Sequence, residues 1–341
     1  MMNRRSGTLV ALALVACGGA NQGTQASSPP DPPLTPSAPS APPDPVAAAS
    51  AGESAEVKSG IQALQSNDLP AAKQAFDAAL KKNPDDADAL YYEGVTAEKM
   101  GDKGAAEKFY KSAIKLRPDH ESASENLSAF YDDAQRYDDA IAVGKAALAR
   151  HADNAALHAN VGIAYAGKND AAKATSELDQ AVKLSASDAA LRLTYAHALQ
   201  GLAQPDAALA QLRAALPLAA DNLGVLAALG HELHVMKAFP DCVSAFDKAV
   251  ALKDAAELRT ERAACKLGAK DNDGAIQDLK TAVTNEPSYV PAHYYLANAL
   301  ASSGKAKDAI VEYQAFLKLQ PNGPMAKAAT EKIKLLKTKG K

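Results

Sequence analysis

Three histidines in the second half of the chain have side chains that could bind a metal ion. His231 and His234 stand three residues apart in the stretch GHELHV, and His197 lies 34 residues before His231. Imidazole is a common ligand of zinc and nickel. The zinc-protease pattern, however, needs its second histidine four residues after the first, and no thiolate or well-placed carboxylate completes a ligand set. We therefore expect these histidines to contact solvent or a bound peptide, with a metal site as the alternative.

Two cysteines, Cys242 and Cys265, are candidates for a disulfide bond. The repeat described below puts Cys242 in the second helix of its sixth copy and Cys265 late in the first helix of its seventh copy. Antiparallel packing of those two helices would put the two side chains at similar heights. A bond closing this loop would contribute about 3 kcal/mol in the loop-entropy model, provided that the compartment is oxidising. The alternative is a pair of free thiols that pack as small apolar side chains.

No pattern typical of catalysis accompanies these residues. The sequence contains no glycine-rich phosphate loop, no nucleophile elbow and no pair of carboxylates isolated among apolar residues. Asp132, Asp133, Asp138 and Asp139 lie close together, but their segment lacks the central glycine and late glutamate of a calcium loop. We expect Asp138 to cap the helix that follows it, and its neighbours either to be solvated or to favour the helix N-terminus. We predict a protein that is not an enzyme and has no cofactor.

The third cysteine, Cys17, ends a short apolar segment near the N-terminus. MMNRR supplies positive charge, and the run from Leu9 to Ala16 is far shorter than the roughly 20 residues that span a bilayer as a helix. The stretch LVAC resembles the lipobox of bacterial lipoproteins, which are cleaved before the cysteine and acylated on it. The resemblance implies a signal peptide over residues 1–16, a palmitate-bearing Cys17 and a lipid anchor in the bacterial cell envelope. Because no aspartate follows Cys17, the outer membrane is favoured. An ordinary signal peptide or a cytosolic start are the alternatives.

Residues 17–52 are rich in proline, alanine and serine. Nine of the chain's 19 prolines fall between Pro29 and Pro45, and aromatic residues are absent from this stretch. Such a composition cannot bury enough apolar surface to offset the entropy of ordering. We expect a disordered tether between the lipid and the folded part.

The rest of the chain repeats itself. Small residues recur at steps of 34, with one step of 33, at Ala72, Ala106, Ala140, Ala174, Ala208, Cys242, Ala275 and Ala309. A second small column lies twelve residues upstream of the first, at Gly60, Gly94, Ser128, Gly162, Ala196, Gly230, Ala263 and Ala297. A column of mostly large residues lies four downstream, at Phe76, Tyr110, Gly144, Leu178, Leu212, Phe246, Leu279 and Tyr313. Gly144 is the exception, and we expect a gap and softer packing in the third repeat.

These columns, followed in several copies by a proline such as Pro118, are similar to the tetratricopeptide repeat. The resemblance implies an all-α, right-handed superhelical solenoid in which about eight helix-turn-helix repeats cover residues 53–323. Residues 324–341 would form a capping helix and a basic tail. We expect Ile333, Leu335 and Leu336 of this helix to cover Phe316.

The resemblance also implies a concave groove lined by the first helix of each repeat. The helical phase predicts that its exposed residues are Tyr91, Tyr92, Asn126, Asn160, His197, His231, His234, Tyr294, Tyr295 and Asn298. Smaller residues between them would admit apolar side chains or a helix; these are Ala156, Ala159, Ile163, Leu193 and Ala227. Tyrosine and asparagine suit adaptable hydrogen bonding to an extended peptide.

The predicted function is therefore that of a scaffold which binds a protein or peptide partner and contacts the membrane only through its N-terminal lipid. The net charge of -3 gives no reason to expect nucleic-acid binding. Two other functions remain open: a regulator of cell-wall enzymes, and a metal carrier or enzyme built on the histidines.

Overall fold

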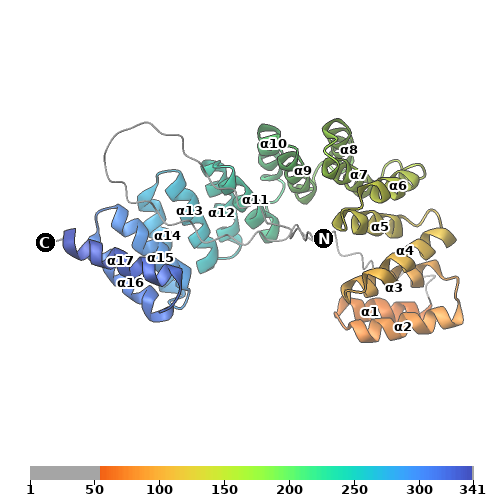
Figure 1. The fold of residues 1–341 in the computed structure, drawn as a ribbon, viewed down its shortest axis with the longest axis horizontal. Coiled ribbons are helices and arrows are strands. Elements are labelled where there is room, and N and C mark those ends of the chain that lie inside the picture. Colours follow the sequence, from red (N-terminus) through yellow and green to blue (C-terminus); the bar gives the residue numbers. More distant parts are fainter. Residues whose placement is uncertain (1–53, 340–341) are drawn as a thin grey trace, which may run out of the picture. The chain divides into compact units, whose positions relative to one another are not determined.

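The computed structural model describes residues 54–339, and over these residues it contains seventeen helices and no strands (Figure 1). The predicted signal peptide, Cys17 and the whole of the predicted tether lie outside the described residues. The all-α class is confirmed. No helix of the described part is long and apolar enough to cross a membrane.

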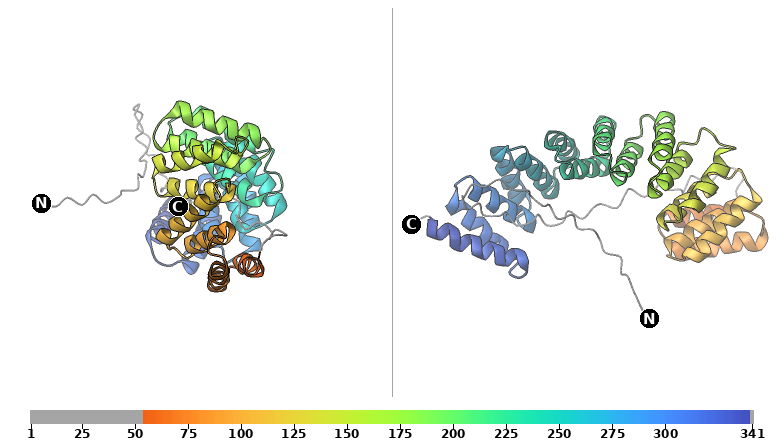
Figure 2. Two further views of the ribbon diagram at one scale, coloured as in Figure 1. Left: turned by 90° about the vertical axis from the view of Figure 1, so that its right-hand side faces the viewer. Right: turned by 45° about the horizontal axis from the view of Figure 1, so that its top comes forward.

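The first sixteen helices form eight consecutive pairs, which we number as repeats 1 to 8. Each repeat has a first and a second helix: α1 Ala55–Gln65 and α2 Leu69–Lys82, α3 Ala87–Lys99 and α4 Lys103–Leu116, α5 Glu121–Asp133 and α6 Tyr137–Leu148, α7 Ala155–Gly167 and α8 Ala171–Leu184, α9 Ala189–Gly201 and α10 Pro205–Ala215, α11 Leu223–Val235 and α12 Phe239–Leu252, α13 Ala256–Gly268 and α14 Asn272–Asn285, α15 Val290–Ser302 and α16 Ala306–Leu319. Helix α17, Pro324–Lys339, follows the last pair. Each pair packs against the next along the chain (Figure 2).

A tight turn joins the two helices of every repeat. Its central residue has a positive φ, from 56° at Ala203 to 82° at Gly101. The next amide then reaches back to the helix that has just ended, as when Asp102 N–H donates to the Ala97 carbonyl over 2.9 Å. This is the hydrogen bond of a Schellman motif, which closes a helix C-terminus.

Aspartates at the ends of these turns start several of the second helices. The side chains of Asp68, Asp102, Asp170 and Asp271 each accept a hydrogen bond from a backbone N–H in the first turn of their helix. Asp138 does not act in this way, contrary to our expectation. Helix α6 starts earlier, after Arg136, so Asp138 lies within its first turn and pairs with Lys168.

The two small columns are buried where the helices of each repeat cross. All eight residues of the column from Ala72 to Ala309 are fully buried. A Cβ atom on Gly94 would lie 2.7 Å from the ring of Tyr110, far inside van der Waals contact. Larger side chains would therefore force the helices apart, which explains why small residues recur there.

Gly144 does not leave the gap that we expected. A Cβ atom on Gly144 would lie 2.4 Å from Cγ2 of Val161, which reaches in from α7 and is fully buried. The next repeat thus supplies the volume that the large column lacks. A single sequence column cannot show this, because the filling side chain comes from another repeat.

Helix α17 covers the last repeat with one side. Ile333 and Leu336 pack into the cluster that contains the fully buried Phe316. Leu335, which we also expected there, is 45% exposed. At about 100° per residue, Leu335 lies some 200° around the helix from Ile333 and cannot share its side.

Candidate partner-binding face

Several first helices of neighbouring repeats contact one another, and we call the surface that the first helices present the first-helix face. These contacts link α1 to α3, run from α5 through α7 and α9 to α11, and link α13 to α15. The predicted groove residues all lie on these helices. Their surroundings decide whether they can meet a partner or are already engaged in packing.

Three of the predicted groove tyrosines are buried rather than exposed. Tyr91, Tyr92 and Tyr294 are only 2%, 5% and 3% accessible. The ring of Tyr91 lies 4.9 Å from that of Tyr92 and 4.9 Å from that of His120, which belongs to the next repeat. Tyr294 packs similarly against Phe316 at 5.1 Å, and burial raises the pKa of both phenols. The rings are thus already engaged in packing, Tyr91 against the next repeat and Tyr294 within repeat 8.

The predicted groove asparagines are half-buried and hydrogen-bonded within the protein. Asn126 Nδ2 donates to the Tyr110 hydroxyl over 3.5 Å, and Asn160 Nδ2 donates to the Glu125 carbonyl over 2.9 Å. Asn298 Oδ1 accepts from the Tyr313 hydroxyl and from Lys332 Nζ, each over 2.6 Å. These amides connect helices, and the bond to Lys332 also ties α17 to repeat 8.

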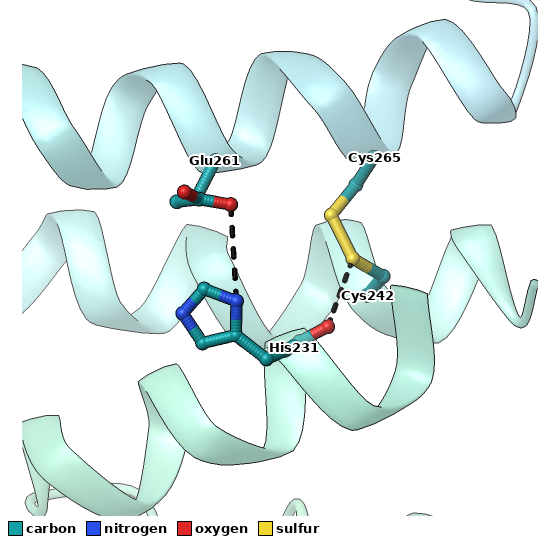
Figure 3. The surroundings of a disulfide bond; sticks show 5 residues. His231, Cys242, Glu261 and Cys265 are labelled. Atoms are coloured by element: carbon teal, nitrogen blue, oxygen red, sulfur yellow. Dashed lines mark hydrogen bonds and ion pairs between the residues drawn. A yellow bond between two sulfur atoms is a disulfide. The ribbon is translucent and has the colours of Figure 1, made fainter. Parts of the chain in front are cut away.

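The three predicted histidines are half-buried, and two of them pair with glutamates of the next repeat. His197 Nε2 lies 3.1 Å from Glu232, and His231 Nδ1 lies 3.9 Å from Glu261 (Figure 3). Burial, followed by the neighbouring His234, lowers the pKa of His231. Among residues 54–339, no group of three or more histidine, cysteine or acidic side chains is arranged to hold a metal ion.

Cys242 and Cys265 form a disulfide bond between α12 and α13 (Figure 3). Their Cα atoms are 5.8 Å apart, within the usual range for such a bond, and both residues are buried. The bond links the second helix of repeat 6 to the first helix of repeat 7. It therefore crosses an interface between repeats rather than closing one repeat on itself.

A recurring polar pair within the repeats escaped the sequence analysis. A residue of the first helix contacts a residue 19 positions later in the second helix, and the pairs are His158–Glu177, Arg192–Gln211, Arg259–Asp278 and His293–Glu312. The atom separations run from 2.7 Å to 3.3 Å. The constant spacing was visible in the sequence, but the residue types change from repeat to repeat.

A shallow cavity lies where α3 meets the start of α5, but its charged groups satisfy one another. It is lined in part by Asp88, Arg117 and His120. Arg117 donates to both carboxylate oxygens of Asp88, and His120 Nδ1 accepts from the Ala123 amide over 3.3 Å. Burial lowers the pKa of His120 to about 4, so the ring is neutral at pH 7. Asp88, Arg117 and His120 are therefore engaged with one another or with the backbone.

Part of the open surface of the first-helix face is apolar. Ala156 of α7 is exposed, and Ile163 of α7, Ala190 of α9 and Ala227 of α11 are half-buried. Ala159 and Leu193, also predicted for this stretch, are buried at 7% and 4%. We call Ala156, Ile163, Ala190 and Ala227 the apolar stretch. It extends over the first helices of repeats 4 to 6.

Models of one repeat family match two parts of the chain. Models of the tetratricopeptide repeat match residues 57–121 and residues 266–333. A segment of 89 residues is 32% identical to serine/threonine-protein phosphatase T of Trypanosoma brucei brucei, and it covers 26% of this chain. The match spans only 19% of that phosphatase, about a fifth of its length.

The solved structure of yeast Tom70 supports the same fold. Yeast Tom70 superposes with a TM-score of 0.51 at 15% identity, over 86% of this chain and 67% of the other. MamA from Desulfovibrio magneticus RS-1 has a TM-score of 0.42 at 21% identity, over 47% of this chain and 90% of the other. With the repeat-family matches and the eight helix pairs, the chain is an all-α solenoid of the tetratricopeptide-repeat type.

Proposed function

We propose that this tetratricopeptide-repeat chain is a non-catalytic scaffold of the bacterial cell envelope that binds a protein or peptide partner on its first-helix face. Repeats of this type support a protein-interaction scaffold. The face, the envelope location and the lipid anchor are the further content of the proposal.

The apolar stretch is the observation that carries the choice of face. The tyrosines, asparagines and histidines nearby already contact neighbouring helices, whereas the stretch keeps partly exposed apolar atoms across α7, α9 and α11. Small residues let a partner's backbone or apolar side chains approach the helices closely. A partner would bury this surface and gain about 25 cal/mol for each Å² removed from water.

Two observations support an envelope location. The N-terminal segment ending in Cys17 resembles a lipobox, and the Cys242–Cys265 bond suits an oxidising compartment. Replacing Cys17 by serine tests the anchor. Metabolic palmitate labelling is expected to disappear and the protein to move from the membrane fraction to the soluble fraction. Unchanged labelling would contradict the anchor but leave the binding face untouched.

Site-specific photo-crosslinking tests the face in the full chain within its native envelope. A benzophenone amino acid at Ala156, Ala190 or Ala227 is expected to capture one defined protein band. The matched controls are Ala172 of α8 and Ala210 of α10, exposed alanines on second helices. Capture from the control positions alone, or none from the apolar stretch, would overturn the proposed face.

A further inference from the structure

Asp132, near the end of α5, has a carboxyl group with no partner. Both Oδ atoms are inaccessible to solvent and make no hydrogen bond, although part of the residue reaches the surface. We expected this aspartate to be solvated, and the structure corrects that. A buried polar group without a partner costs roughly 1–3 kcal/mol, and more when it is charged.

The preceding repeat shows what Asp132 lacks. Glu98 occupies the equivalent position, 34 residues earlier, and its Oε2 accepts a hydrogen bond of 2.6 Å from the Tyr110 hydroxyl. The residue twelve positions after Asp132 is Gly144, where the residue twelve positions after Glu98 is Tyr110. Val161 replaces the lost volume at Gly144 but carries no donor. The space beside Gly144 is therefore filled, but the Asp132 carboxyl group still lacks a hydrogen-bond donor.

Charged groups around Asp132 do not compensate for the missing donor. Asp133, its neighbour on α5, adds negative charge. From α4, Glu107 binds the Tyr131 hydroxyl over 2.9 Å and also pairs with Lys111.

The cations at the start of α6 and the end of α7 are engaged with other acids. Arg136, at the start of α6, pairs with Glu107 and with Asp139. Lys168, at the end of α7, pairs with Asp138. No basic side chain of the described residues forms an ion pair with Asp132.

We propose that Asp132 makes repeat 3 a pH-sensitive joint, in which the neutral carboxyl group permits tight packing of α5 on α6 and α7, and loss of its proton to solvent loosens that packing. Helix α7 carries Ala156 and Ile163, so the joint adjoins the apolar stretch. It would adjust the geometry of the proposed binding face, yet it exists whether or not a partner binds there.

The direction of the effect follows from proton linkage. Burial, with a smaller contribution from Asp133, raises the pKa of Asp132 from its ordinary 3.8 to about 8. Between these values the closed repeat holds a proton that the opened repeat releases. Opening therefore becomes easier as pH rises from about 4 to about 8, by at most about tenfold per pH unit, and changes little above that range.

Hydrogen exchange of the full chain between pH 5.5 and pH 8.5 measures this opening without a partner. After correction for intrinsic exchange rates, the opening constants of α5 to α7 are expected to rise with pH up to about pH 8, by at most about tenfold per pH unit. Asp132→Asn removes the titrating group at nearly constant shape and is expected to flatten this slope. The slope persisting in Asp132→Asn would overturn the proposal.

Two further variants sharpen the test. Asp153→Asn removes an exposed acid just after α6 and is expected to leave the slope unchanged. Gly144→Tyr combined with Val161→Ala places a hydroxyl donor in repeat 3 at the position that Tyr110 occupies in repeat 2. The pH range over which the opening constant rises is expected to move to lower pH. If Asp153→Asn flattened the slope as fully as Asp132→Asn, the joint would not be located at Asp132. Because no partner takes part, failure here would not affect the crosslinking result.

Discussion

Asp278 lies in α14 of repeat 7 and Asp132 in α5 of repeat 3. The residues around Asp278 stabilise its negative charge, whereas those around Asp132 do not. Asp278 accepts hydrogen bonds of 2.8 Å from Arg262 Nε and from Lys266 Nζ, and a longer one from Arg259. Burial by itself would raise the pKa of Asp278, but the bonds from Arg262 and Lys266 outweigh it and lower the pKa. Asp132 has burial without donors, so its pKa rises to about 8.

The comparison shows that a regular backbone does not give regular energetics. Both aspartates lie on helices whose start, end and small-residue columns follow the same repeat. The hydrogen-bond donors that reach each carboxylate decide whether its charge is stabilised or opposed. Repeat 7 is consequently expected to be most stable with its acid ionised, and repeat 3 with its acid neutral.

The largest effect is expected from Asp278→Ala. It leaves Arg259, Arg262 and Lys266, which are between 14% and 18% exposed, without their shared counter-charge. Removing one partner of a buried ion pair costs about 3–5 kcal/mol. Urea unfolding followed by circular dichroism measures the loss. The control is Asp254→Ala, whose carboxylate is 49% exposed and pairs with Arg259; an equal loss from both variants would contradict the comparison.

The disulfide bond stabilises the region around repeat 7, where Asp278 already has its hydrogen-bond partners. Replacing Cys242 and Cys265 together by alanine is expected to lower the free energy of unfolding by about 3 kcal/mol, because the unfolded chain is no longer looped. Exchange of α12 and α13 amides should increase in the same variant. If α5 and α6 responded as strongly, the two regions would not be energetically separate.

The pH dependence of Asp132→Asn sharpens the comparison further. The variant's gain in stability over the native chain is expected to grow by up to about 1.4 kcal/mol per pH unit between pH 5 and pH 8. Asp278, whose pKa is lowered, contributes its stability above pH 4 and loses it only as the medium becomes more acidic. Urea unfolding at pH 5 and pH 8 should show a stability difference that changes with pH for Asp132→Asn and one that stays constant for Asp278→Ala. A gain for Asp132→Asn that shrank with rising pH would reverse the assignment.

A substitution in a turn is expected to change stability slightly and by the same amount at every pH, so it serves as a reference for the pH-dependent variants. Ala203 adopts a φ of 56° in the turn of repeat 5, where repeat 2 has Gly101. Relief of the left-handed strain by Ala203→Gly is expected to stabilise the protein by at most about 1 kcal/mol, partly offset by the greater freedom of glycine when unfolded. Thermal unfolding at pH 5 and pH 8 should give the same shift. A shift that varied with pH would mean that the turn is coupled to a titrating group.

The repeat could be predicted from the sequence because every copy obeys the same steric demand. Two helices approach closely only where Gly94 or Ala106 stands, and the period of 34 residues follows from the length of two helices and their turns. The helical phase was less informative for the binding face. It gave the side of α3 on which Tyr91 lies, but not that His120 of the next repeat would cover it.

By itself, the sequence determined the class of fold, the period and the buried columns, because these depend on residues within one repeat. Only the tertiary structure decided that Val161 fills the space at Gly144, that Tyr91 and Tyr294 are enclosed, and that Asp132 has no donor. The physical reason is that each first helix meets the helices of the repeats before and after it. Whether a side chain there is exposed or paired depends in part on residues of the neighbouring repeats, such as His120 beside Tyr91.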